Sequence, residues 1–280
     1  MSCCSARRKA ERKFGEGEKQ LLNSAAEVFA LMIENARLND RALEQEKLRR
    51  DLALAAEVQR RLLPPQPPSS PAASLAAFTL AARTIGGDCY DFVELPGGGI
   101  GIAVADVAGK GVAAALLTSV VQTSLRMILA DGEVTPALLA ARMNRFLHRS
   151  TASASYATFF YAQLEADGRR LRYVNAGHNP PYLVRRAAAG TDIVELSTGG
   201  MVLGMFPDVA YEDAEIALHR GDLLVVFTDG VTEARSASDE EFGEDRLKDL
   251  LQQSVGLPAA AISSTLADRM QQWIAGRRAA

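Results

Sequence analysis

Residues 100–111, IGIAVADVAGKG, decide how the rest of the chain is interpreted. The first eight, residues 100–107, are apolar apart from Asp106 and predict a strand buried on both faces. The glycines that follow end this strand, and the almost entirely apolar residues 112–130 predict a helix directly after it. Asp106 therefore ends the most buried strand of the protein. A structural alternative to a functional role is a tight turn in which Asp106 is the N-cap of that helix.

Two further aspartates lie at the same kind of boundary between apolar chain and glycine. Asp88 follows two glycines, and Asp229 follows the apolar run that ends at Phe227. Carboxylates that converge from separate loops are the ligands that Mg²⁺ and Mn²⁺ prefer. Two such ions about 3.5–4 Å apart can activate a water and hold a phosphoryl oxygen. The sequence therefore predicts a two-metal phosphohydrolase that uses Asp88, Asp106 and Asp229, although Asp229 also fits a simple Asp-Gly turn.

Four motifs carry a family resemblance: GGDCYDF (86–92), DVAGKG (106–111), NAGHNPP (175–181) and FTDGVTEAR (227–235). In this order they resemble the bacterial PP2C-type (PPM) serine/threonine phosphatases of the SpoIIE/RsbU class, over residues 53–275.

The resemblance implies an αββα sandwich of two mostly antiparallel sheets, with two Mn²⁺ or Mg²⁺ ions at one edge. It implies that Asp106 bridges both ions and that the Val107 carbonyl reaches one of them. It also implies that Asp229 binds the first ion and Asp88 the second.

The family has another metal-binding aspartate in a DDxT-like segment near its C-terminal end, and residues 273–280 contain no such segment. We therefore expect a phosphatase domain over residues 75–280 that lacks its C-terminal strand. The resemblance implies that its substrate is a phosphorylated STAS-type anti-sigma-factor antagonist in partner-switching signalling. The alternatives are a catalytically silent phosphatase-like dimerisation and signalling module, and a hydrolase of small phosphoesters.

Residues 18–63 contain no proline or glycine and predict a long helical linker. Apolar residues recur with the 3-4 alternation of a coiled coil up to residue 43, and the register then slips. We expect a homodimer through residues 18–63, whose helix positions Asp88 and Asp106; the alternative is a helix that lies on its own domain. Residues 14–38 also resemble the last helix of a GAF sensory domain. Residues 64–74 form a Pro/Ser-rich break.

The remaining pattern predicts an α+β domain, because strands come in hairpins and helices in pairs. Further helices are expected at 136–149, 244–255 and 258–274. Strands are expected at 76–85, 90–95, 156–166, 169–175, 181–186, 192–196, 213–218 and 222–228.

The composition limits which classes of binding partner and which cellular compartment are expected. The net charge of −3 argues against nucleic acid as the main partner. Three cysteines without regular spacing indicate the reducing cytoplasm rather than a disulfide framework. No apolar run approaches the roughly 18–20 residues of a membrane span, so no membrane partner is expected.

Several polar side chains near the motifs have two interpretations each. Cys89 is expected to be a small, half-buried strand residue rather than a nucleophile. Asp91 and Glu233 are expected to support the ligands or lie at the surface. His178 is expected to be a hydrogen-bonded loop residue rather than a general acid, and His148 and His219 surface residues. Arg83 is either a phosphate contact or an exposed strand charge.

Overall fold

The computed structural model describes residues 15–80, 86–109, 111–151, 155–187 and 190–276. These residues divide into two compact units, one ending at Asp51 and the other beginning at Leu52. The first unit consists of the N-terminal part of helix α1, which runs over Glu16–Leu62. This agrees with the helix predicted over residues 18–63.

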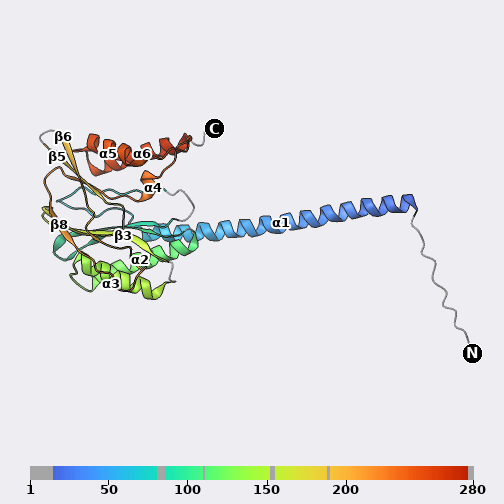
Figure 1. Cartoon of the computed structure of the whole chain (residues 1–280), viewed down its shortest axis with the longest axis horizontal. Helices are drawn as coiled ribbons and strands as arrows, with labels where there is room; N and C mark the ends of the chain where they lie inside the picture. Colours follow the sequence, from blue (N-terminus) through green and yellow to red (C-terminus); the bar gives the residue numbers. More distant parts are fainter. Residues whose placement is uncertain (1–14, 81–85, 110, 152–154, 188–189, 277–280) are drawn as a thin grey trace, which may run out of the picture. The chain divides into compact units, whose positions relative to one another are not determined.

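The second unit begins with the last turns of α1 and continues through alternating strands and helices (Figure 1). Its described elements are, in chain order, β1 (Asp88–Glu94), the 3-10 turn η1 (Pro96–Gly98), β2 (Ile100–Val107), α2 (Val112–Ala130), α3 (Pro136–Ser150), β3 (Ala157–Leu164), β4 (Arg170–Ala176), β5 (Tyr182–Ala187), β6 (Gly190–Glu195), β7 (Gly199–Gly200), β8 (Ala214–Ala217), β9 (Leu223–Val225), α4 (Asp229–Thr232), α5 (Gly243–Ser254) and α6 (Ala259–Ala275).

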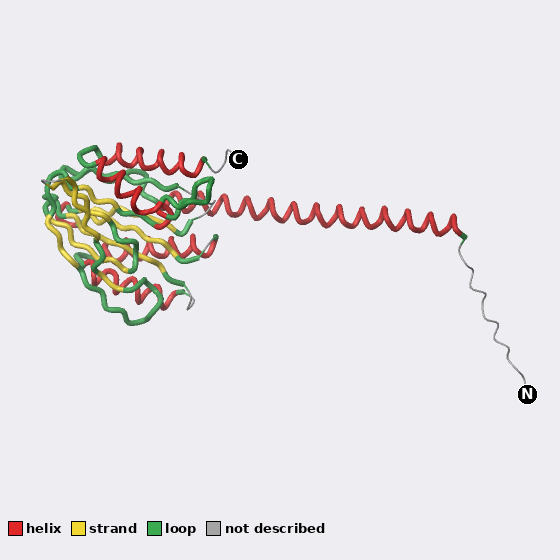
Figure 2. Tube along the Cα trace, turned by 45° about the horizontal axis from the view of Figure 1, so that its top comes forward, coloured by secondary structure: helices red, strands yellow, loops and turns green. Residues whose placement is uncertain are grey.

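Two sheets form the centre of this unit. The first has the order β1-β2-β3-β4-β7, with β8 also paired to β4, and the second has the order β6-β5-β9. Every pairing between named strands is antiparallel except β4 with β7. Helices α2 and α3 cover the first sheet, and α5 and α6 cover the second (Figures 1 and 2). The predicted αββα architecture is therefore confirmed.

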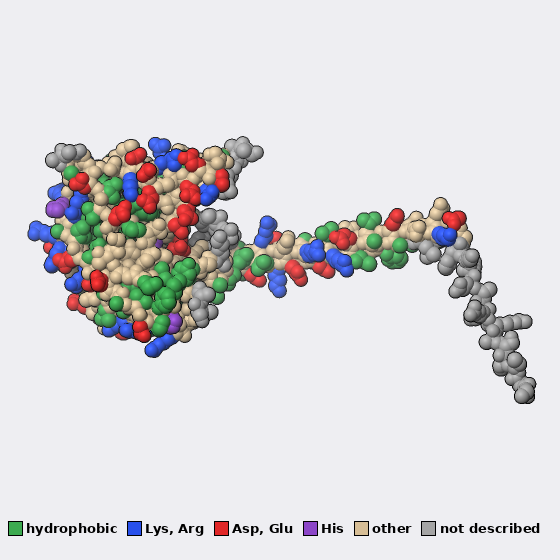
Figure 3. Space-filling view, in the orientation of Figure 1, with side chains coloured by type: hydrophobic (Ala, Val, Ile, Leu, Met, Phe, Trp, Pro, Cys, Tyr) green, Lys and Arg blue, Asp and Glu red, His purple; other side chains and the backbone are tan. Residues whose placement is uncertain are grey.

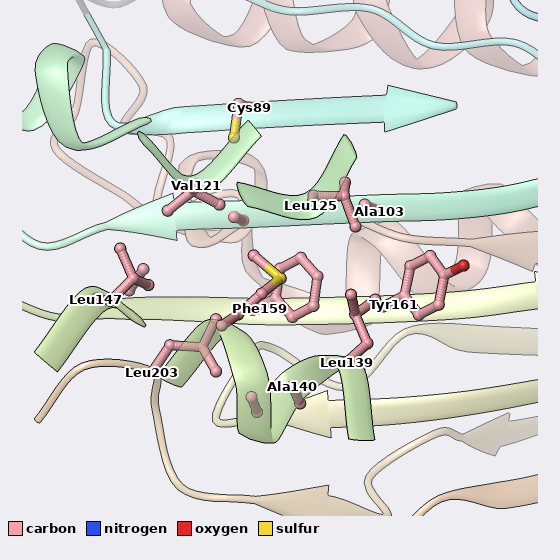
Figure 4. Close-up of a cluster of buried hydrophobic side chains, with 14 of the residues drawn as sticks. Cys89, Ala103, Val121, Leu125, Leu139, Ala140, Leu147, Phe159, Tyr161 and Leu203 are labelled. Carbon is pink, nitrogen blue, oxygen red and sulfur yellow. The ribbon is translucent and has the colours of Figure 1, made fainter. Parts of the chain in front are cut away.

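The largest core lies between the first sheet and its two helices (Figure 4). Leu139 and Met143 of α3 and Phe159 of β3 are fully buried there. A second cluster packs β5 and β9 against α5 and α6, and a third fills the space between the sheets around Phe160 and Leu183. Each face of each sheet thus contributes apolar side chains to one of these three clusters. Burial of these side chains between neighbouring layers stabilises the four-layer sandwich.

The stretch from β2 to α2 has the bounds that the sequence predicts. The expectation that both faces of β2 are buried is wrong in part. Ala103, Ala105 and Val107 are buried under α2, whereas Ile102 and Val104 on the other face are only half buried. The second face borders a cleft between the two sheets that also contains Asp106, and this accounts for its partial exposure.

The strand expected at residues 76–85 is not confirmed. Residues 76–80 pair with no strand among the described residues, and residues 81–85 lie outside them. The short elements β7 and α4 were not predicted.

Helix α2 is the one described helix that is long and apolar enough to cross a membrane, so the expectation that no run approaches that length is wrong. Half of its apolar stretch is buried, and it packs in the core over β1 and β2.

Candidate active site

The β1–β2 hairpin places Asp88 directly opposite Asp106. The two residues are register partners at the open end of the antiparallel pair, and the 3-10 turn Pro96–Gly98 closes the other end. Opposite residues of an antiparallel pair have their Cβ atoms about 4.5–5.5 Å apart on the same face. The strand pairing alone therefore brings the first and second predicted carboxylates side by side.

This proximity changes the proton affinity of Asp106. Its pKa is raised to about 7, first by burial, then by a hydrogen bond with Asp88 and by the negative charges of Asp88, Asp229 and Glu233. Like charges this close cannot both be ionised without a compensating cation or a shared proton. The site is therefore poised to take up positive charge.

The third carboxylate arrives from the other sheet. Strand β9 leads through Phe227 into α4, whose first residue is Asp229. The Thr228 hydroxyl donates a hydrogen bond of 2.7 Å to Oδ2 of Asp88. This bond ties the end of β9 to the start of β1, across the edge between the sheets. Thr228 was not singled out in the sequence, although its place directly before Asp229 was a usable signal.

Gly87 allows the backbone to approach this edge closely. A Cβ atom at Gly87 would lie 2.5 Å from the Val107 carbonyl oxygen and 3.0 Å from Oδ1 of Asp106. The Gly87 carbonyl accepts hydrogen bonds from the Val107 amide at 3.2 Å and from the Thr118 hydroxyl of α2 at 3.0 Å. Any larger side chain would occupy the space in front of Asp106 and the Val107 carbonyl.

The last turns of α1 also reach the glycines before Asp88. The side-chain amide of Gln59 donates a hydrogen bond of 2.8 Å to the carbonyl of Gly86, and Ala56 packs against Ala115 of α2. The sequence pattern gave no signal for the role of Gln59, because the contact joins segments 27 residues apart.

His178 lies behind the carboxylates as a buried loop residue, as expected. Its Nδ1 is 2.8 Å from the Thr158 hydroxyl, and its backbone amide donates to Oδ1 of Asn175. Burial lowers the pKa of His178 to about 4, against the opposing effects of Asp88 and the Phe227 carbonyl. A histidine that is neutral at pH 7 is not a cationic proton donor, which favours the structural interpretation.

The structure also places the two other histidines, which were expected at the surface, and Glu233, which was expected near the ligands or at the surface. His219 is exposed, whereas His148 is half buried and hydrogen-bonds Gly204, so its assignment to the surface is only partly right. Glu233 follows α4, near enough for its charge to raise the pKa of Asp106.

Cys89 and Asp91 do not belong to the site. Cys89 is buried in the core, and burial raises the pKa of its thiol far above the usual range, so no thiolate nucleophile is available. Asp91 is buried rather than at the surface and pairs with Arg126 of α2, with N–O distances of 2.6 and 2.9 Å. Arg83 and Lys110 lie outside the described residues.

The donor chemistry of this edge fits a hard divalent cation. It offers the paired carboxylates of Asp88 and Asp106, the neighbouring Val107 carbonyl and the nearby charge of Asp229, all oxygen donors. Within the described ranges, however, no group of three or more His, Cys, Asp or Glu side chains is already gathered around one point. The pairing of Asp88 with Asp106 is formed, and Asp229 is near enough for its charge to raise the pKa of Asp106.

Comparison with known proteins identifies the family. The family model described as Stage II sporulation protein E (SpoIIE) matches residues 96–280. The chain belongs to the SpoIIE family. The matched range contains the β2–α2 segment and the motifs around His178 and Asp229. The resemblance drawn from the sequence is therefore confirmed.

Among the relatives of this SpoIIE-family chain is the phosphoserine phosphatase RsbU of Bacillus subtilis, 32% identical over 192 residues. These residues are 69% of the present chain and 56% of RsbU. The phosphoserine phosphatase RsbP of the same organism is 25% identical, over 65% of the present chain and 45% of RsbP. The chain thus spans about half the length of the curated relatives it matches.

Solved structures agree on the fold of the SpoIIE-family unit. The SiaA-PP2C domain of Pseudomonas aeruginosa has a TM-score of 0.67 at 20% identity, over 82% of this chain and 92% of that domain. The RsbU and RsbW domains of a Mycobacterium tuberculosis protein have a TM-score of 0.57 at 28% identity, over 69% of this chain and 52% of that one. The unit therefore has the PP2C phosphatase fold.

Proposed function

We propose that the chain is a metal-dependent protein serine/threonine phosphatase. The observation that carries this proposal is the carboxylate pair of Asp88 and Asp106 at an open edge between the sheets, where partial burial, and then the hydrogen bond and charge of Asp88, raise the pKa of Asp106 to about 7. A half-buried pair of acids is unfavourable unless a cation or proton compensates it. Two of the relatives are phosphoserine phosphatases by name, which supports the same reaction here.

Asp88, Asp106, Asp229 and the Val107 carbonyl would hold two Mn²⁺ or Mg²⁺ ions. Bound there, the ions would supply a water of lowered pKa and neutralise charge on the phosphoryl oxygens. The chain's own groups would set the geometry: the Thr228 hydroxyl orients the Asp88 carboxylate, and Gly87 leaves the approach to Asp106 free. Cys89 is a buried, protonated thiol and the His178 ring is buried in its loop, so neither is expected to act as a nucleophile and no phosphoenzyme is expected.

Phosphate release from a phosphoserine peptide, with Mn²⁺ or with EDTA, tests this function. The chain should release phosphate only with the metal, and Asp106→Asn should abolish the release. Asp192→Asn, at an exposed position of β6, is the matched control and should keep the activity. Turnover that persists in EDTA or in Asp106→Asn would contradict the proposed mechanism.

A catalytically silent phosphatase-like module is the second candidate. It is favoured by the absence, within the described ranges, of a cluster of three metal-ligating side chains. It predicts no phosphate release with Mn²⁺, Mg²⁺ or any mixture of them. Isothermal titration calorimetry would then also show no Mn²⁺ binding that depends on Asp106, whereas the enzyme should show such binding.

We further propose a phosphorylated STAS-type protein as the substrate, in the cytoplasm. This rests on the resemblance to the RsbU class, with which the relatives RsbU and RsbP agree. The phosphoserine form of a STAS-domain protein should be hydrolysed with a higher kcat/KM than casein phosphorylated at serine. Equal kcat/KM values for both substrates would contradict the proposed substrate class.

The N-terminal helix is proposed as a dimerisation and regulatory segment over residues 1–63, followed by the break at 64–74 and the phosphatase domain at 75–280. Apolar side chains on the described part of the first unit are exposed, among them Phe29, Met32 and Leu43. Burial of such side chains against a second copy would be favourable. The Gln59–Gly86 hydrogen bond gives the same helix a direct contact with the residues before Asp88.

Light scattering after size-exclusion chromatography tests the dimer. The double variant Phe29→Asp/Met32→Asp should be a monomer, and its Mn²⁺-dependent rate should differ from that of the parent chain. Glu34→Gln, on the same helix, is the control. An unchanged mass in the double variant would refute the proposed dimerisation through this helix, and an unchanged rate would refute its proposed regulatory role.

A further inference from the structure

The loop between β7 and β8 exposes an unusual amount of apolar surface. Met201, Met205 and Phe206 are 51%, 36% and 46% exposed, whereas Leu203 between them is fully buried in the core of the first sheet. We call residues 201–206 the apolar platform. Figure 3 shows a continuous area of hydrophobic side chains on the face in view. Exposed apolar patches of this kind often mark interaction sites.

The platform is held rigidly from below. The buried side chain of Asn144, in α3, accepts from the Gly204 amide at 2.8 Å and donates to the carbonyls of Phe206 and Pro207 at 2.9 and 3.3 Å. His148, one turn further along α3, lies 3.0 Å from the Gly204 carbonyl. The exposure of the apolar side chains is therefore a property of an ordered loop. A surface that is already ordered loses little conformational entropy when a partner binds.

The loop that carries the platform is hydrogen-bonded to the strand that faces Asp106. Leu203 and Ala157 exchange two backbone hydrogen bonds of 2.8 and 3.0 Å, and the residue after Ala157 is the register partner of Asp106. On the other side, Val202 packs so closely on Gly177 that a Cβ atom there would lie 2.6 Å from it. A folded protein whose phosphoserine reaches Asp106 can therefore also contact this loop.

The helix that clamps the platform is positively charged. Arg142, Arg145 and Arg149 are exposed on α3, and within the described ranges none of them has an ion-pair partner. Helix α3 contains no acidic residue. The carboxylates of the active site would repel an acidic phosphoprotein, and these arginines would attract one. Apolar contact and charge thus favour the same class of partner.

We propose that the apolar platform, together with the arginines exposed on α3, is the docking surface for the folded phosphoprotein substrate. This inference rests on the proposed phosphatase function and extends it from the phosphoserine to the fold that carries it. Methionine side chains are flexible and polarisable, so they adapt to a partner surface that must be released after each turnover. A short phosphopeptide or a small phosphoester would reach the carboxylates without touching the platform.

The test compares one phosphoserine in two contexts. The substrates are the phosphoserine form of a STAS-domain protein and a phosphopeptide with the sequence around that serine. The double variant Met201→Ser/Phe206→Ser should lower kcat/KM for the phosphoprotein at least tenfold, through KM, because truncation of interface anchors typically weakens binding by that much. Its kcat/KM for the phosphopeptide should stay unchanged, which also shows that the site has folded. Met127→Ser, at a position of α2 that is more exposed than either platform residue, is the control and should alter neither value.

Calorimetric binding of the phosphoprotein to Asp106→Asn, with and without the platform substitutions, is measured in parallel. If the parent chain hydrolyses neither substrate, the proposed function fails, and the binding arm alone decides on docking. Unchanged affinity and kcat/KM in the platform variant would overturn the proposal, as would an equal loss for protein and peptide. A change in oligomeric mass in the same variant would assign the platform to a second copy of this chain and would also overturn it.

Discussion

Replacement of Asp106 by asparagine should stabilise the metal-free protein while it removes the activity. In the native chain the pKa of Asp106 is about 7, whereas an unfolded aspartate has a pKa of about 3.9. The native state therefore binds the proton more tightly than the unfolded state does. The contribution of Asp106 to stability is greatest below about pH 4 and is lost as the pH rises through 7, because the ionised carboxylate is unfavourable at this half-buried place beside Asp88.

The size of the effect follows from the same two values. A difference of about three pH units corresponds to an upper limit of about 4 kcal/mol at pH 8. Asp106 is only half buried, so solvent screening reduces this to about 1–2 kcal/mol. Asparagine has nearly the same shape and no charge. Asp106→Asn should therefore raise Tm by about 3–6 °C at pH 8 in EDTA.

Differential scanning calorimetry of both proteins at pH 8 and pH 4.5 measures this difference. The gain should shrink at the lower pH, where the native parent carries a protonated Asp106. Added Mn²⁺ should raise the Tm of the parent chain more than that of the variant, because the parent offers the carboxylate pair to the ion. A variant that is less stable than the parent at pH 8 in EDTA would refute this account of the site.

Three further substitutions test the surrounding structure. Asp91→Asn should lower the free energy of unfolding by about 2–3 kcal/mol, because it removes the buried partner of Arg126; urea unfolding measures this, and activity per folded molecule should stay. Leu139→Ala should destabilise by about 2–5 kcal/mol through a cavity under the first sheet, and a loss below 1 kcal/mol would contradict the burial. Cys89→Ala should keep metal-dependent turnover, and in a chain with Cys3 and Cys4 replaced, the Cys89 thiol should react with a thiol reagent only after unfolding.

The fold was predictable wherever one local signal dominated. Strand β2 and helix α2 have the predicted bounds because an apolar run and a glycine-rich turn mark them. Residues 76–80 look like a strand by composition, yet whether a segment joins a sheet depends on a partner edge that composition does not encode. The two-residue strand β7 is held by its parallel pairing with β4, which is a tertiary contact without a sequence pattern.

The candidate site was predictable in its residue types and less so in its arrangement. The motifs indicated Asp88, Asp106 and Asp229, whose roles as metal ligands stay predictions. The register that sets Asp88 opposite Asp106 depends on the hairpin turn, and the Thr228–Asp88 hydrogen bond spans 140 residues of sequence. Long-range contacts of this kind follow from the packing of two sheets and have no local signal. The GAF-like character of residues 14–38 also stays a prediction.

The separation of the three carboxylates along the chain has a consequence for biogenesis. Asp88 and Asp106 are joined by a short hairpin, a local structure that can form while later residues are still being synthesised. Asp229 and Thr228 arrive only when β9 has paired with β5 in the second sheet. A nascent or C-terminally degraded chain thus carries the repelling acid pair without the element that completes the edge. Metal affinity would then report the completion of the whole sandwich, and partly made chains would remain inert.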